Sequence, residues 1–148
     1  MHAPHTSTSN PHEAPAAFRH PIRVYWEDTD AGGVVFYANY LKFFERARTE
    51  WLRGLGFSQQ QMLQQDGVMF VVTDTALRYR RAARLDDRLD ITVQLLQCGR
   101  ASLHIAQQAL RGADVLAEGD IRIACVQHGP DEPFRPSRIP VAILQKLS

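Results

Sequence analysis

Apolar residues along this chain recur with two different spacings, which separate a helical part from a strand-rich part. From Tyr40 onward they return in steps of four, three, four and four residues: Phe44, Ala47, Trp51 and Leu55. This spacing places them on one face of an α-helix, and its burial stabilises the helix by about 1.5–3 kcal/mol per large side chain. Glycines at positions 54 and 56 indicate where this long helix ends.

Extended segments dominate the rest of the chain. After a short helix predicted between Ser58 and Gly67, β-branched and alternating apolar residues predict four strands: 68–79, 89–95, 103–107 and 115–126. Short turns connect the later strands, so neighbours should pair antiparallel. Before the long helix, alternation predicts a half-buried strand with three residues on one face: Ile22, Val24 and Trp26. Three prolines at 130–136 predict a loop, and 141–147 a terminal helix.

This order of elements predicts an α+β protein in which an antiparallel sheet wraps around one long central helix, the hotdog arrangement. The aromatic surplus on that helix, Phe43, Phe44 and Trp51, exceeds what one sheet covers, so we expect a second copy and hence a homodimer at least. Residues 1–17 are rich in His, Pro, Ser, Thr and Ala and are predicted to be a disordered tail. Residues 18–148 are predicted to be a single domain.

Composition narrows the function classes. The 148 residues carry a net charge of +1, which does not favour nucleic-acid binding, and no apolar run is long enough for a transmembrane helix. Two cysteines without metal-ligand spacing favour free thiols in a reducing cytoplasm. The histidines, cysteines and acidic residues show no metal spacing, so no metal or retained cofactor is expected.

The candidate chemistry lies just ahead of the long helix, in the acidic turn Glu27-Asp28-Thr29-Asp30-Ala31-Gly32-Gly33. A helix N-terminus carries unpaired N–H groups and partial positive charge, which suit a carbonyl that becomes an oxyanion. A carboxylate in this turn, Asp30, could attack that carbonyl or direct water at it. Asp before Gly-Gly is also ordinary turn chemistry, so the spacing alone leaves both interpretations open.

The long stretch Arg23-Val24-Tyr25-Trp26-Glu27-Asp28-Thr29-Asp30-Ala31-Gly32-Gly33-Val34-Val35-Phe36-Tyr37-Ala38-Asn39-Tyr40-Leu41, with Phe43-Phe44-Glu45-Arg46-Ala47-Arg48 after it, resembles the 4-hydroxybenzoyl-CoA thioesterase family. Within that family it is most similar to the YbgC-type acyl-CoA thioesterases associated with the Tol–Pal system. Leu85-Asp86-Asp87 also fits the family's strand-to-strand turn. The resemblance implies a hotdog fold, a homodimer or a homotetramer built as a dimer of dimers, an active site shared between subunits, and hydrolysis of acyl-CoA to free acid and CoA.

The resemblance also assigns roles. It implies that Asp30 is the catalytic base or nucleophile and that the backbone N–H of Tyr37, at the start of the long helix, polarises the thioester carbonyl. YbgC-type enzymes often carry His at this position, and a Pro is common where this chain has Ala82. Glu45, on the long helix, is the rival carboxylate, although we expect it instead to form a structural pair with Arg48 or to orient the loop. A basic cluster could contact CoA phosphates: Arg78, Arg80, Arg81 and Arg84.

Two other functions stay open. One is a dehydratase of the same fold acting on acyl-carrier-protein thioesters, but such enzymes use a catalytic His, and none occurs between His20 and His104. The other is a non-catalytic acyl-thioester-binding or scaffold protein at the cell envelope. The resemblance allows acyl carrier protein as a partner beside acyl-CoA, which is the substrate and not a retained cofactor.

Overall fold

The computed structural model describes residues 17–129 and 132–147. Its elements are β1 (Phe18–Arg23), the 3₁₀ turn η1 (Trp26–Asp28), α1 (Asn39–Gly54), α2 (Gln59–Asp66), β2 (Val68–Tyr79), β3 (Arg88–Cys98), β4 (Ser102–Arg111), β5 (Asp114–Gly129), β6 (Glu132–Pro136) and α3 (Val141–Leu147). The predicted tail, residues 1–17, lies outside the described residues except for Ala17.

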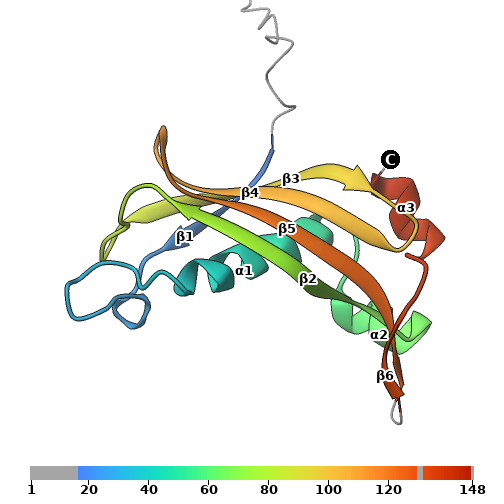
Figure 1. Ribbon diagram of the computed structural model, residues 1–148. Coiled ribbons are helices and arrows are strands. Elements are labelled where there is room, and N and C mark those ends of the chain that lie inside the picture. The colour runs from blue at the N-terminus through green and yellow to red at the C-terminus, as the bar shows by residue number, and fades with distance from the viewer. Residues whose placement is uncertain (1–16, 130–131, 148) are drawn as a thin grey trace, which may run out of the picture.

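One antiparallel sheet forms from the described strands in the order β1-β3-β4-β5-β2, with β6 added alongside β5. The sheet curves around α1, which lies against its concave face (Figure 1). The loop that leads into α1 projects at one end of the sheet, and α2 lies toward the other. The predicted α+β hotdog arrangement is confirmed.

The core lies between α1 and the concave face. Phe43, Phe44 and Ala47 of α1 are fully buried there against alternate residues of the sheet. Gly119 of β5 lets the helix approach closely, because a Cβ atom at this position would stand 2.7 Å from the Phe44 ring. Only a glycine at position 119 therefore permits this close contact between α1 and β5.

Several predicted boundaries hold. Ser58 caps α2 by accepting a hydrogen bond from the backbone N–H of Gln61, and Gly67 ends that helix in the left-handed conformation. The face predicted for the last long strand is buried: Ile121, Ile123 and Cys125. The terminal helix forms as α3.

Two expectations about the ends of the sheet are wrong. The first strand ends at Arg23, and the chain turns there, so Trp26 lies in η1 with 78% of its surface exposed. The residue that continues the buried alternation is Val24, which is fully buried. The proline-rich segment contains the strand β6, because Pro136 and its neighbours pair with the end of β5. Residues 130 and 131 of the predicted loop lie outside the described residues.

Strand β2 is the last in the main order of the sheet, and most of its second half is exposed. Its register against β5 shifts between Val72 and Asp74, where Thr73 is the extra residue of a bulge. The bulge turns Thr75, Leu77 and Tyr79 toward the α1 side, opposite Ile121, Gly119 and Ala117 of β5. No helix in the described residues has the length and hydropathy of a membrane span.

Candidate active site

The acidic loop between β1 and α1 is organised around the buried carboxylate of Asp28, which is 5% exposed. Its Oδ2 accepts a hydrogen bond from the backbone N–H of Tyr25 at 2.8 Å, and its Oδ1 accepts one from the side-chain amide of Asn39 at 2.8 Å. Asn39 is the first residue of α1, and its side chain reaches back to Asp28. Asp28 is thus a structural residue that fastens the loop to the helix.

Asp30 lies in an exposed, tightly closed turn. Its Oδ1 accepts hydrogen bonds from the backbone N–H groups of Gly32 at 2.9 Å and Val34 at 3.4 Å. Its own N–H donates to the carbonyl of Val34, and Gly33 takes a positive φ of 76° that closes the turn. Its Oδ2 has no hydrogen bond to any described residue. The turn therefore holds the carboxylate by one oxygen and leaves the other available for chemistry.

The turn is attached to the segment before β3. The backbone N–H of Val35 donates to Ala83 at 2.8 Å, and that of Leu85 donates to Gly33 at 3.3 Å. Asp87 supports this segment by accepting hydrogen bonds from the Arg84 backbone N–H at 2.9 Å and from the Arg111 guanidinium at 2.8 Å. Burial alone would raise the pKa of Asp87, but these two donors outweigh it and hold the pKa below its usual value. The predicted strand-to-strand turn thus anchors the acidic loop.

Two backbone donors at the start of α1 are unused. The N–H groups of Asn39, Tyr40 and Leu41 donate three residues back, to Phe36, Tyr37 and Ala38, at 2.8, 3.4 and 3.2 Å. The N–H of Phe36 donates to the carbonyl of Asp28 at 3.1 Å.

Between these donors, the N–H groups of Tyr37 and Ala38 have no hydrogen-bond acceptor among the described residues. Unpaired N–H groups at a helix start carry partial positive charge. The donor predicted at Tyr37 is therefore available, and Ala38 adds a second one that the sequence did not indicate.

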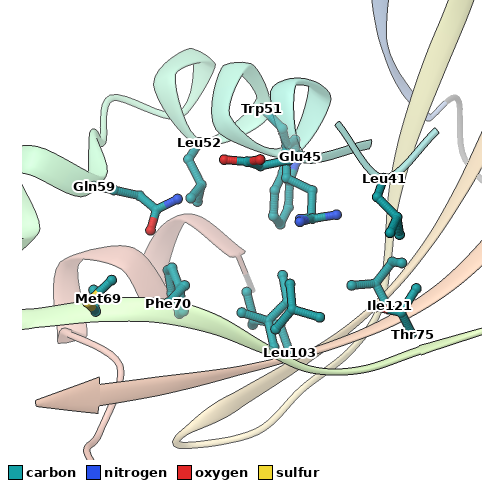
Figure 2. Close-up of a pocket in the computed structure, with 13 residues that line it drawn as sticks. Leu41, Glu45, Trp51, Leu52, Gln59, Met69, Phe70, Thr75, Leu103 and Ile121 are labelled. Carbon is teal, nitrogen blue, oxygen red and sulfur yellow. The ribbon is translucent and has the colours of Figure 1, made fainter. Parts of the chain in front are cut away.

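A cavity of about 440 Å³ lies beneath α1, and it contains the rival carboxylate. Trp51 and Leu52 of the helix point toward Phe70, Leu103 and Ile121 on the strands below, and the Glu45 side chain lies at the level of the helix (Figure 2). Leu41 also lines this cavity, and of the α1 residues in the lining it is the one nearest the start of the helix. Glu45 is exposed and also borders a polar hollow on another side of α1, beside His20 and Arg46.

Arg48 lines the same cavity and does not form the expected pair with Glu45. Its guanidinium donates to the buried Gln107 side chain at 2.9 Å. The amide of Gln107 donates in turn to the carbonyls of Phe44 at 3.1 Å and Thr92 at 3.3 Å. Burial lowers the pKa of Arg48, and the negative charge of Glu45 partly opposes this shift. Glu45 thus acts on Arg48 only through its field.

A smaller cavity of about 260 Å³ lies beside Tyr37, and only two of the four arginines of the predicted basic cluster line it. Arg80 and Arg81 line it, and each also pairs with an acidic residue, Glu118 at 3.0 Å and Asp114 at 3.6 Å. Arg78 lies on the other face of β2 and lines a separate hollow. The backbone N–H of Arg84 holds Asp87. The four arginines therefore do not form one site.

One histidine, His104, has a carboxylate partner, but it lies on the face of the sheet that points away from α1. His104 Nε2 is 2.7 Å from Asp120 Oδ1. Its strand neighbours Leu103 and Ile105 are buried toward α1, so His104 points to the outer face. Within the described ranges, no three His, Cys, Asp or Glu residues gather as a metal site would require.

Comparisons with known proteins agree on one family. A family model described as the thioesterase-like superfamily matches residues 24–147. The chain belongs to the thioesterase-like superfamily.

Individual relatives in this superfamily are similar over most of their length. The acyl-CoA thioesterase YbgC of Haemophilus influenzae is 45% identical over 116 residues, which are 78% of this chain and 85% of that protein. The acyl-CoA thioester hydrolase YbgC of Escherichia coli O157:H7 is 44% identical over 110 residues, 74% of this chain and 81% of that protein. The crystal structure of a probable thioesterase from Bartonella henselae superposes with a TM-score of 0.79 at 34% identity, covering 84% of this chain and all of that one.

Sequence reasoning missed one side chain at this site. The hydroxyl of Tyr79 donates to the backbone carbonyl of Tyr37 at 3.1 Å, across 42 residues of sequence. Unbroken alternation along 68–79 would have put Tyr79 on the face away from α1. Only the bulge at Thr73, which has no reliable signal in the sequence, turns it toward the loop.

Proposed function

We propose that this chain hydrolyses acyl-CoA thioesters to a free acid and CoA. The observation that carries the proposal is the pairing, in one short loop, of a carboxylate with a free oxygen and two unused N–H donors. Asp30 supplies the carboxylate, and Tyr37 and Ala38 supply the donors. Membership of the thioesterase-like superfamily and the names of the YbgC relatives support the same reaction.

In this mechanism the thioester carbonyl oxygen sits at the start of α1. The Tyr37 N–H polarises it, and the negative charge that forms on this oxygen is stabilised by the fixed dipole. Asp30 then acts in one of two ways. As a base it takes a proton from water, which attacks the carbonyl carbon; the resulting tetrahedral intermediate then breaks its C–S bond and releases CoA thiolate, which takes up the proton, and the free acid. As a nucleophile it forms a mixed anhydride and expels the CoA thiolate, and water then hydrolyses the anhydride.

We place the acyl chain in the cavity beneath α1 and the CoA portion beside Arg80 and Arg81. The cavity volume of about 440 Å³ is that of a small-molecule site, and its lining is mainly apolar. The two arginines line the smaller cavity together with Tyr37, and Arg78 and Arg84 do not line it. Arg78 and Arg84 are weaker candidates for the CoA phosphates, given their positions.

We further propose a homodimer or homotetramer that works in the cytoplasm. The open edge of β2, with exposed Val72 near the cavity, and exposed Leu41 at the cavity's end offer a second copy both backbone and apolar partners. Two unpaired cysteines, Cys98 and Cys125, suit a reducing compartment. Sedimentation equilibrium tests the assembly, and a monomeric mass at micromolar concentration would contradict it.

The test of the reaction is thiol release from a panel of acyl-CoAs of increasing chain length, with aromatic acyl-CoAs and acyl-carrier-protein thioesters included. We expect steady turnover by the unmodified protein and a loss of at least about a hundredfold in kcat for Asp30→Asn, in the range of a missing base. Glu27→Gln is the matched control, because Glu27 is an exposed acid of the same loop. A single turnover in ¹⁸O-labelled water that leaves label in Asp30 would identify the anhydride route.

Other outcomes would overturn this assignment. If Glu45→Gln abolished turnover and Asp30→Asn did not, Glu45 would be the catalytic carboxylate. Tight binding of acyl-CoA without turnover at any chain length would favour the scaffold function. Formation of an enoyl product from hydroxyacyl-carrier-protein would favour the dehydratase. The link to a Tol–Pal system is a proposal from resemblance that neighbouring genes would test.

A further inference from the structure

The two peptide units just before α1 are held by their carbonyl groups. The Phe36 carbonyl accepts the Asn39 N–H at 2.8 Å. The Tyr37 carbonyl accepts the Tyr79 hydroxyl at 3.1 Å and the Tyr40 N–H at 3.4 Å. Both peptide bonds are trans, as are all those of the described residues, so in each unit the N–H points away from the carbonyl. Fixing these carbonyls therefore also fixes the directions of the unused Tyr37 and Ala38 N–H groups.

The two units are not held equally well. The Phe36 unit is held by a short bond from the helix itself, whereas the backbone bond to the Tyr37 carbonyl is long. The shorter contact on the Tyr37 carbonyl comes from the side chain of Tyr79. The orientation of the Ala38 N–H thus depends on a residue from another element of the fold.

Tyr79 is placed for this task and has little share in the core. It is the last residue of β2, and its ring packs edge-on against Tyr37, with centroids 6.0 Å apart, and near Tyr40 at 5.6 Å. It remains 45% exposed. Burial, and to a lesser degree Tyr37, raise the pKa of Tyr79, so the phenol keeps its proton and stays a donor at neutral pH.

We propose that Tyr79 is a positioning residue for the thioesterase reaction: its hydroxyl holds the Tyr37–Ala38 peptide so that the Ala38 N–H joins the Tyr37 N–H in polarising the thioester carbonyl. The inference rests on the proposed function. The physical reason is preorganisation, since a dipole that already points at the developing oxyanion need not reorient during the reaction. Tyr79 itself does not touch the reacting atoms in this scheme.

The first test replaces the hydroxyl alone, in Tyr79→Phe. We expect kcat to fall about tenfold, equal to about 1.4 kcal/mol of transition-state stabilisation, while KM changes less than about twofold and the melting temperature is unchanged. The matched control is Tyr25→Phe, because Tyr25 is an exposed tyrosine outside the contacts that hold the Tyr37–Ala38 peptide. This control should keep both kcat and the melting temperature.

The second test reads the polarisation directly. The best acyl-CoA of the panel, labelled with ¹³C at the thioester carbon, is bound to Asp30→Asn, and the carbonyl stretch is measured by difference infrared spectroscopy. We expect a shift to lower frequency relative to free acyl-CoA, and a smaller shift in Asp30→Asn combined with Tyr79→Phe. A structural role for Tyr79 would not change this frequency.

The possible outcomes distinguish a failure of the Tyr79 proposal from a failure of the proposed thioesterase function. If Tyr79→Phe kept both kcat and the full carbonyl shift in an active thioesterase, Tyr79 would not position the donor, although the hydrolase would stand. If the unmodified protein released no thiol from any acyl thioester, the proposed function would fail first.

Discussion

The loop ahead of α1 and the cavity beneath α1 both contain charged side chains beside apolar surface, but they hold charge differently. In the loop, Asp28 is buried with a donor on each oxygen, and Asp30, two residues later, keeps one oxygen free. In the cavity, Arg48 is desolvated and, among the described residues, donates a hydrogen bond only to the neutral amide of Gln107, with Glu45 acting at a distance. The loop thus pairs a carboxylate whose two oxygens are both bound with one that keeps an oxygen free, whereas the cavity has a cation in its lining, where we propose that the acyl chain binds.

This difference indicates which amino-acid substitutions each region tolerates. The loop is overdetermined by backbone hydrogen bonds to the segment before β3, so its exposed groups can be altered without loss of the fold. The cavity is shaped by side chains alone, so substitutions there should change which acyl chains fit more than how fast they react.

We expect the largest effect on stability from replacing Asp28, the buried carboxylate that holds the loop to α1. Asp28→Ala removes a charged acceptor from two donors, Tyr25 N–H and the Asn39 amide, and should lower the free energy of unfolding by about 2–4 kcal/mol. Urea denaturation measures this loss. The contrasting variant, Asp30→Asn, keeps an acceptor oxygen for Gly32 and Val34 and should leave stability nearly unchanged. Equal losses in the two variants would remove the distinction between a supporting and a reactive carboxylate.

A smaller effect is expected in the cavity. Arg48→Met replaces a desolvated cation with an apolar side chain of similar length, so long apolar acyl-CoAs should bind more tightly. We expect their KM to fall about fivefold, roughly the value of burying one more methylene group, with kcat unchanged. Steady-state kinetics with octanoyl-CoA and longer chains measures it. The control is Arg46→Met, an exposed position on the same helix. An unchanged KM in Arg48→Met would mean that the acyl chain does not reach this part of the cavity.

The smallest expected effect is on the stability that Asp87 contributes, and it depends on pH. Asp87 supports the segment that holds the acidic loop. The pKa of Asp87 is lower in the folded protein than in the unfolded chain, so its ionised form stabilises the fold above a pH of about 4. This contribution disappears as the pH falls through the folded-state pKa. Asp87→Asn should therefore have a lower melting temperature than the unmodified protein at pH 7, and the gap should narrow at pH 3.

Thermal denaturation at the two pH values measures this gap. Asp86→Asn is the control, because Asp86 adopts a positive φ of 70° that Asn also accepts, and its side chain has no comparable partner among the described residues. A gap for Asp87→Asn that stayed constant with pH would show that the lost interaction is not that of an ionised carboxylate.

Much of this protein could be predicted from local patterns. The four-and-three spacing from Tyr40 predicted α1 because helix periodicity is a property of neighbouring residues, and Ser58 and Gly67 marked α2 because capping is equally local. Trp26 was misplaced for the opposite reason. Its position continues the alternation of the strand, but the carboxylate of Asp28 draws the Tyr25 backbone into a turn instead.

The sequence by itself determined the helices, the long strands, their order around one central helix, and Asp30 as a carboxylate in front of a helix start. Only the tertiary structure decided what surrounds that carboxylate. Asn39 could not be matched to Asp28, nor Tyr79 to the Tyr37 carbonyl, because such pairs join segments whose approach is set by packing. The face that Tyr79 presents depends on one extra residue at Thr73, and a one-residue shift reverses every later side chain of a strand.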